Sequence, residues 1–267
     1  MKKIKTILLI ICIPQFACST NKEDRETTRP GINNPLTPAH ILSGYTMVWN
    51  DEFDGTSVNT SKWNYRGEGT VRNYATVSRQ TISLNGNGQV SIKVNKNTDG
   101  KYYVGQLGTQ GIFETTYGYF ECRALMNKGF GPHVAFWLQS PDLGKTGDPV
   151  VDGTEIDIFE YHRKTPGNVH HNLHWDGYGV NHKHIGTQIP YAAADTGYHT
   201  FGLEWTEKEY IFYVDGKETW RTQTAVSKRR EYLILSTELT GWGGDPATGT
   251  FPDEILFDYV RVYKSKQ

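Results

Sequence analysis

The stretch Tyr210-Ile211-Phe212-Tyr213-Val214-Asp215-Gly216 joins five aromatic or β-branched residues to an Asp-Gly pair. Residues of these types favour β-strands, and Asp-Gly is a strong signal for a tight β-hairpin turn. Similar short runs, broken by Gly, Asn and Asp, recur at residues 90–94, 119–124, 134–138, 201–205, 233–236 and 255–263. No stretch keeps a helical period over eleven residues. We therefore expect an all-β sandwich in which one sheet has a free face that can curve into a cleft.

The composition fits one globular domain. The chain has 267 residues, a formal net charge of −1 and 37% hydrophobic residues, enough for one sizeable core. It has no block of Lys and Arg and therefore no electrostatic footprint for nucleic acid. Its seven Trp, sixteen Tyr and eleven Phe suit a β-sheet core and also a protein that stacks sugars on aromatic rings. Composition does not separate these two uses.

Residues 1–18 have the pattern of a leader. Three lysines lie among the first five residues, residues 7–13 are apolar, and Ala17-Cys18 ends the segment. The apolar part is too short to span a membrane, which takes about 20 residues. Ala17-Cys18 resembles the bacterial lipobox, so we expect a lipoprotein signal peptide with Cys18 as the lipidated residue. The alternative is an ordinary signal peptide with an incidental cysteine.

Residues 19–43 are polar and Pro-rich, which predicts a flexible tether before a catalytic domain at residues 44–267. Within it, Lys22-Glu23-Asp24 resembles the acidic tag that sends some Gram-negative lipoproteins to the cell surface. We therefore expect a monomer that is lipid-anchored in the outer membrane and surface-exposed. Only Cys122 remains after the leader, so the domain has no internal disulfide.

Three carboxylates lie in the apolar run Glu155-Ile156-Asp157-Ile158-Phe159-Glu160. Acids are rarely placed among apolar residues unless they are paired or used. In a regular strand Glu155 and Asp157 share one face and Glu160 lies on the other. A bulge at Phe159 or its neighbour would bring Glu160 to the same face. The run therefore predicts a bulged strand that carries a glycosidase site.

Retaining glycosidases use two carboxyl groups about 5–5.5 Å apart. In this scheme Glu155 attacks the anomeric carbon, and Glu160 protonates the leaving oxygen and later activates water. Asp157 would hold Glu155 by a hydrogen bond and help to keep the two pKa values apart. The alternative is a set of surface salt bridges on an edge strand, which the flanking Ile and Phe disfavour.

The run Glu-x-Asp-x-x-Glu resembles the bulged signature of glycoside hydrolase family 16. Further segments resemble the family framework in the same order, namely residues 48–55, 117–121, 135–138, 198–205, 213–216 and 257–263. The resemblance covers residues 45–264. It implies a β-jelly roll of two curved antiparallel sheets with an open substrate cleft, and retaining chemistry. It also implies the roles given above for Glu155, Asp157 and Glu160.

Two segments depart from the family pattern. Laminarinase-like members usually have Trp-Pro-Ala-Phe-Trp, where this chain has His133-Val134-Ala135-Phe136-Trp137. The common Asn-x-Ala-x-Gly-Gly is replaced by Ser-Thr-Glu-Leu-Thr-Gly-Trp-Gly-Gly at residues 236–244. Both segments line the cleft in relatives. The two departures therefore leave the identity of the substrate undecided and do not affect the predicted chemistry.

Aromatic residues and histidines complete the predicted site. His174-Trp175 resembles a His-Trp pair that faces the carboxylates in related glucanases, and Trp rings can stack on a pyranose face. Core packing is the alternative for each Trp. His133 stands in place of the missing Trp and could donate a hydrogen bond to substrate. The predicted substrate-binding residues are Trp137, His174, Trp175, Trp242, Tyr178 and His133.

Metal sites receive less support. The histidines at 162, 170, 171, 174, 182 and 184 do not follow a known zinc spacing, and a catalytic metal is redundant beside two carboxylates. We therefore expect no cofactor for catalysis. Many relatives hold a structural calcium on the convex face, and Glu52 and Asp258 occupy the matching positions.

Together these features predict a retaining, endo-acting β-glycosidase for a polysaccharide, with a β-1,3- or mixed β-1,3/1,4-glucan favoured. The alternative substrate is a β-linked galactan such as agarose, porphyran, carrageenan or a keratan-like glycan. A surface glycan-binding protein without activity is a different class, which the intact carboxylate triplet disfavours. A transglycosylase would differ only in how well the site excludes water.

Overall fold

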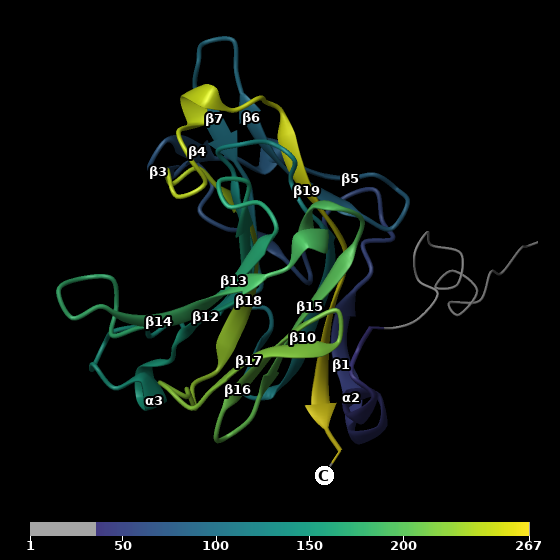
Figure 1. Ribbon diagram of the computed structural model, residues 1–267, viewed down its shortest axis with the longest axis vertical. Helices are drawn as coiled ribbons and strands as arrows, with labels where there is room; N and C mark the ends of the chain where they lie inside the picture. Colours follow the sequence, from purple (N-terminus) through teal and green to yellow (C-terminus); the bar gives the residue numbers. More distant parts are fainter. Residues whose placement is uncertain (1–35, 267) are drawn as a thin grey trace, which may run out of the picture. The chain divides into compact units, whose positions relative to one another are not determined.

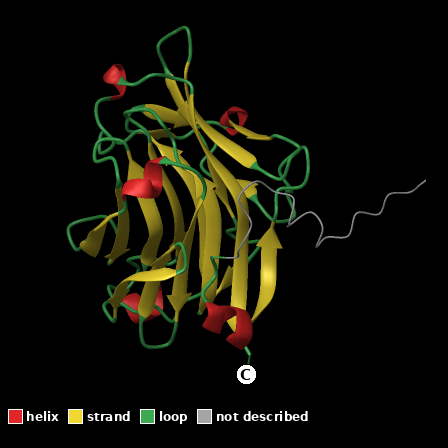
Figure 2. Cartoon of the chain, turned by 45° about the vertical axis from the view of Figure 1, so that its right-hand side comes forward, coloured by secondary structure: helices red, strands yellow, loops and turns green. Residues whose placement is uncertain are grey.

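Two β-sheets pack against each other in the computed structural model, which describes residues 36–266. Figures 1 and 2 show the strands of both layers curving along their length. We call the larger one the back sheet. Its eleven strands are β1 (Tyr45–Asp51), β3 (Val71–Arg72), β4 (Ala75–Val77), β5 (Ile82–Leu84), β6 (Val90–Lys96), β7 (Tyr102–Val104), β10 (Gly118–Leu125), β15 (His199–Trp205), β16 (Tyr210–Val214), β17 (Lys217–Thr222) and β19 (Asp253–Ser265).

The second layer, which we call the cleft sheet, carries the predicted carboxylates. Its eight strands are β2 (Asn64–Tyr65), β8 (Gln106–Gly108), β9 (Glu114–Thr115), β11 (His133–Gln139), β12 (Glu155–His162), β13 (Asn168–Trp175), β14 (Lys183–Pro190) and β18 (Glu231–Glu238). Neighbouring strands follow the order β14-β13-β12-β11-β18-β8-β2, and β9 pairs with β18. Neighbouring strands in residues 36–266 pair antiparallel except β4 with β7. The predicted all-β sandwich of two curved antiparallel sheets is confirmed.

The hairpin signal that follows residue 214 produces the β16–β17 connection. Asp215 and Gly216 have φ values of 48° and 71°. Positive φ at both central residues is the requirement of a type I′ turn, which matches the twist of the flanking strands. A Cβ atom on Gly216 would lie 2.1 Å from the carbonyl oxygen of Leu36, so this position also needs glycine for space.

Strand alternation places the core between the sheets. Along β11, Val134, Phe136 and Leu138 are fully buried in the main core. The intervening side chains, from His133 through Trp137, line the opposite face of the sheet. The same period of two in β18 leaves Ser236 and Glu238 on that open face. The fold therefore supplies one polar, concave face for a site.

The folded domain begins before the predicted boundary at residue 44. Helix α2 (Ala39–Gly44) buries Ile41 completely against Tyr119 and Ile211. Just before it, the Thr37 hydroxyl donates to Glu121 Oε1 at 2.8 Å. The assignment of residues 36–43 to a flexible tether is therefore wrong. The predicted signal peptide, Cys18 and the rest of the tether lie outside the described residues.

The remaining helices are short. They are α3 (Pro149–Asp152), η1 (Arg79–Thr81), η2 (Ala192–Asp195) and η3 (Pro246–Thr248). Within residues 36–266 no helix has the length and apolar character needed to cross a membrane.

The two residues predicted for calcium are both paired with arginines. Arg261 donates to both oxygens of Glu52 at 2.9 and 3.0 Å, and Arg123 forms a buried ion pair with Asp258 at 2.5 Å. Their negative charge is thus already compensated. These two side chains do not fit the oxygen cluster that a calcium ion requires.

Candidate active site

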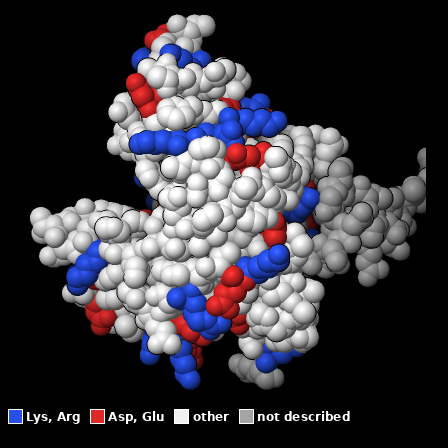
Figure 3. Space-filling model, in the orientation of Figure 1, with Lys and Arg blue, Asp and Glu red and all other residues white. Residues whose placement is uncertain are grey.

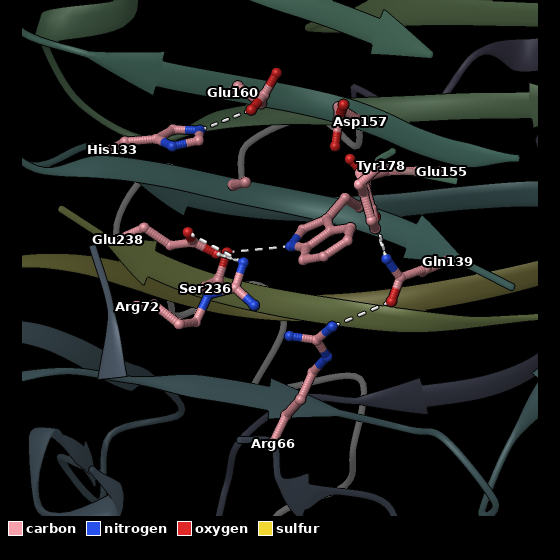
Figure 4. Close-up of a pocket in the computed structure, with 12 residues that line it drawn as sticks. Arg66, Arg72, His133, Gln139, Glu155, Asp157, Glu160, Tyr178, Ser236 and Glu238 are labelled. Carbon is pink, nitrogen blue, oxygen red and sulfur yellow. Dashed lines mark hydrogen bonds and ion pairs between the residues drawn. The ribbon is translucent and has the colours of Figure 1, made fainter. Parts of the chain in front are cut away.

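A β-bulge in β12 brings three carboxylates to one face. Phe136 of β11 pairs with Phe159 and Trp137 pairs with Asp157, which leaves Ile158 as an extra residue. The pairing with β13 skips at the same place. Ile158 and Phe159 are consecutive, yet both are fully buried in the core. The predicted bulge is confirmed, and it turns Glu160 to the face of Glu155 and Asp157 (Figure 4).

The carboxylates line an open pocket of about 280 Å³ on the cleft sheet. In Figure 3 the surface is hollowed between the β13–β14 end and the part that carries β3 and β4. On the face shown, basic and acidic side chains lie interspersed. The pocket residues are Arg66, Arg72, His133, Ala135, Trp137, Gln139, Glu155, Asp157, Glu160, Tyr178, Ser236 and Glu238.

Glu155 is held by two neutral donors. Gln139 Nε2 donates to its Oε2 at 3.0 Å, and the Tyr178 hydroxyl donates to the same oxygen. Burial nevertheless dominates its titration. Together with the charge of Glu160 it raises the pKa of Glu155 to about 7, against the lowering effect of the two hydrogen bonds.

Asp157 lies between the two glutamates and is 4% exposed. Its Oδ2 has no hydrogen-bond partner, and His174 Nε2 lies 3.5 Å away without hydrogen-bond geometry. Burial, and then the charges of Glu160 and Glu155, raise its pKa well above the ordinary value. Asp157 is therefore held in the neutral form.

Glu160 has a donor on each oxygen. His133 Nε2 lies 2.7 Å from Oε1, and Asn172 Nδ2 donates to Oε2. Burial favours the neutral form, but it is outweighed by the hydrogen bond and charge of His133 together with the hydrogen bond from Asn172 and the charge of His174. The pKa of Glu160 therefore lies below its ordinary value. In the free protein Glu155 and Asp157 therefore hold protons more firmly than Glu160 does.

The predicted sugar-binding residues divide into those that reach the pocket and those that do not. Trp137 lines the floor, where its indole N–H donates to Ser236 Oγ at 3.1 Å and Arg66 lies over its ring at 5.2 Å. Tyr178 reaches over Glu155 from an exposed loop. Trp242, at 36% exposed, lies at the rim against His133.

Trp175 does not lie in the cleft. It packs against the main core, since alternation in β13 turns it away from the face on which His174 meets Asp157. Its prediction as a sugar platform is wrong for this reason.

His174 forms, with Glu155 and Asp157, a group of side chains whose ligand atoms lie close enough together to hold a metal ion. Its ligand nitrogen and one oxygen each of Glu155 and Asp157 all lie within 4.8 Å of one another. The His174 Nδ1 lies 2.9 Å from His182 Nε2. Within residues 36–266 no other group of three met this spacing, so the remaining histidines of the sequence pattern do not assemble into one metal site.

Sequence reasoning missed several pocket residues on neighbouring strands. Gln139 lies two residues after Trp137 and Glu238 two residues after Ser236, so the period of two could have found them. Arg66 and Arg72 come from the distant β2 and β3 region. Arg66 donates to Gln139 at 3.1 Å, and Arg72 pairs with Glu238 at 3.2 Å. No local signal marks them, because their contacts join residues 73 and 166 positions apart.

Two glutamates in unlike environments on one concave face are the arrangement that a glycoside hydrolase uses. Comparison with known proteins agrees. The model of "Glycosyl hydrolases family 16" matches residues 70–260. The chain belongs to this family.

Individual relatives act on different polysaccharides. The chain is 32% identical to the β-glucanase of Rhodothermus marinus over 82% of this chain and 85% of that one. It is 29% identical to β-porphyranase B of Zobellia galactanivorans, over 97% and 95% of the two chains. It spans 40% of the glucan endo-1,3-β-glucosidase A1 of Niallia circulans, at 27% identity over 88% of this chain.

A solved structure is similar to this chain in both sequence and fold. SCLam, a non-specific endo-β-1,3(4)-glucanase, is 29% identical, with a TM-score of 0.71 over 84% of this chain and 92% of that one.

Proposed function

We propose that the protein is a retaining, endo-acting β-glycosidase that hydrolyses a polysaccharide, with a β-1,3- or mixed β-1,3/1,4-glucan as substrate. The observation that carries the proposal is the bulge at Ile158, which places Glu155 and Glu160 on one face of an open cleft. An open cleft lets a long chain lie across the carboxylates and be cut internally.

In the first step Glu155 attacks the anomeric carbon as the bond from that carbon to the leaving oxygen breaks. Glu160 gives its proton to that oxygen. The products are a glycosyl ester on Glu155 and a carboxylate on Glu160. In the second step Glu160 takes a proton from water while the water oxygen attacks the anomeric carbon. The ester breaks, and both glutamates return to their starting forms.

The surrounding residues prepare these roles. Gln139 and Tyr178 fix the oxygen of Glu155 that they contact. Asp157, with its raised pKa, remains neutral between the glutamates and adds no further charge. Since Glu155 holds its proton more firmly than Glu160 does, the productive form is a minor one that forms when the proton of Glu155 moves to Glu160.

The glucan assignment draws support from the names of the relatives and of SCLam. Trp137 and Trp242 offer aromatic surface on the floor and at the rim, as a neutral glucan requires.

A β-linked galactan is the second candidate. It is favoured by His133 in place of a tryptophan and by Arg66 and Arg72 in the pocket. The match to a porphyranase over 97% of this chain points the same way.

One experiment tests both candidates. The purified protein is incubated with laminarin, lichenan, agarose, porphyran, carrageenan and keratan sulfate, and the products are sized and followed by proton NMR. Internal cutting gives a ladder of oligosaccharides, and retention gives the β-anomer first. Hydrolysis of laminarin or lichenan supports the glucan, and hydrolysis of a galactan alone supports the second candidate. No products from any polysaccharide, or the α-anomer first, would contradict the proposed function.

We also propose that Cys18 is lipidated and anchors the protein at the outer membrane. The proposal is supported by the basic, apolar and Ala17-Cys18 succession of the leader. Labelled palmitate fed to producing cells should enter the protein, and Cys18→Ser should abolish the labelling. Equal labelling of both proteins would contradict it.

A further inference from the structure

The first residue of β11 reaches the acid/base of the site. His133 Nε2 lies 2.7 Å from Glu160 Oε1, and both side chains are nearly buried, at 12% and 10% exposed. Figure 4 shows the imidazole pointing along the sheet toward Glu160. The sequence suggested that this histidine contacts substrate. Its ring nitrogen is instead engaged with a carboxylate.

The other ring nitrogen has no access to a sugar. His133 Nδ1 is buried and has no hydrogen-bond partner. The ring meets the indole of Trp242 edge to face, at 4.8 Å and 83°. The polar function of this imidazole is therefore directed to Glu160 alone.

The surroundings of His133 carry both signs of charge. On β12 it faces Glu160 and, further along, Glu155; His162 is its cross-strand partner there. On β18 it pairs with Glu238, which Arg72 holds by an ion pair. His170 of β13 lies against Trp242, at 4.9 Å between ring centroids.

The contact between His133 and Glu160 requires a proton on Nε2. His133 donates to Glu160 Oε1 through Nε2–H both as the imidazolium, whose charge lowers the pKa of Glu160, and as the neutral ring protonated at Nε2. The neutral ring protonated at Nδ1 would offer Oε1 no donor. Asn172 can only donate to Oε2 through its amide nitrogen, and Oε2 keeps room for the transferable proton.

We propose that His133 is a positioning residue of the acid/base: its Nε2–H holds Glu160 Oε1 and stabilises the carboxylate that forms when Glu160 Oε2 gives its proton to the leaving oxygen. This rests on the proposed glycosidase function. His133 itself gains and loses no proton in the step. A charge-assisted hydrogen bond strengthens as the acid becomes a carboxylate, so the contact favours the transition state over the ground state.

Two variants separate the hydrogen bond from the shape of the ring. His133→Phe keeps a planar ring against Trp242 but has no donor. His133→Gln keeps an N–H donor. Both are compared with wild type on two glycosides of the oligosaccharide that wild type releases. One has a 2,4-dinitrophenyl leaving group, which departs without protonation, and the other has 4-methylphenyl, which needs it. kcat/KM is measured because it reports the first chemical step.

For His133→Phe we expect a loss of about 10²-fold or more on the 4-methylphenyl glycoside and less than about threefold on the dinitrophenyl glycoside. His133→Gln should recover most of the loss. His40→Gln is the matched control. His40 lies in α2, is exposed and contacts Glu204 of the back-sheet strand β15. Thermal unfolding checks that each variant is folded.

Equal losses on both glycosides would overturn the proposal, as they would indicate a role in binding or packing. Wild-type activity of His133→Phe, or no recovery by His133→Gln, would overturn it as well. Failure of the wild type on every polysaccharide would instead contradict the proposed function and would be seen before any variant is made.

Discussion

Ile158 and Phe159 are neighbours in the chain, and both side chains are fully buried in the same core. A regular strand would send one of them to the cleft. The bulge resolves this conflict by adding one residue to β12, and Phe159 packs against Phe201 at 4.1 Å between ring centroids, with the ring planes tilted by 34°. Packing of two adjacent apolar side chains thus sets the direction of Glu160.

Deletion of Ile158 should leave all three acids on the cleft face. The strand would then read Glu-Ile-Asp-Phe-Glu, which alternates without a bulge. We expect a folded protein with measurable hydrolysis, destabilised by about 2–5 kcal/mol through loss of a buried side chain. Chemical denaturation and reducing-sugar assays measure both. Ile158→Ala is the control, since it loses the side chain and keeps the bulge. A folded deletion variant without activity, beside active Ile158→Ala, would show that the bulge itself sets the spacing of the glutamates.

Trp242 and Trp175 should respond differently to replacement by alanine. Trp242 lies at the rim, so Trp242→Ala should raise KM about 2- to 10-fold, the equivalent of 0.5–1.5 kcal/mol, and leave the unfolding temperature nearly unchanged. Trp175 packs on the core, so Trp175→Ala should lower stability, by less than the about 3–5 kcal/mol of a fully buried Trp. An increase in KM for Trp175→Ala with unchanged stability would contradict its placement.

The local pattern of the sequence was sufficient for much of the fold and for the acids. The Asp-Gly turn, the strand runs and the bulge all depend on the period of two and on turn chemistry within a few residues. The same period rules out Trp175 once His174 faces the carboxylates. The prediction for Trp175 followed from the resemblance of the His174-Trp175 pair, whose two side chains lie on opposite faces of the strand.

What the sequence could not predict depends on partners far along the chain. Glu52 and Asp258 look like metal ligands until Arg261 and Arg123, 209 and 135 positions away, are seen beside them. Helix α2 has six residues, too few for a periodic signal, and it is held by burial of Ile41 against other strands. Long-range register decides these features.

Glu155→Gln should abolish turnover and keep substrate binding. The amide has the shape of the acid but is not a nucleophile, so kcat should fall by at least about 10⁴-fold. Binding of the polysaccharide is followed by calorimetry and hydrolysis by product release. As a positive control, azide added to Glu155→Gly should restore activity and give an α-glycosyl azide. Persistent hydrolysis by Glu155→Gln would remove Glu155 from the nucleophile role.

The activity should fall as the pH rises through about 7. The pKa of Glu155 is raised to about 7 by burial, while that of Glu160 is lowered by His133. Below about pH 7 the pair of glutamates holds one proton, which can move to Glu160 and produce the active form. Above it this proton is lost and neither glutamate can act as the acid. A profile of kcat/KM from pH 4 to 10 measures this alkaline limb. A limb above pH 9 would mean that another group controls it.

Tyr178→Phe should lower kcat/KM and shift the alkaline limb of its pH profile. The Tyr178 hydroxyl donates to Glu155 Oε2, and this hydrogen bond lowers the pKa of Glu155. Without it the pKa of Glu155 rises, so the alkaline limb of kcat/KM should shift to higher pH. A hydrogen bond to a charged group contributes about 1.5–3 kcal/mol, so the maximum of kcat/KM should fall by about 10- to 150-fold. Because Tyr178 lies on an exposed loop, the unfolding temperature should stay near that of wild type. An increase in KM with an unmoved limb would instead assign Tyr178 to substrate contact alone.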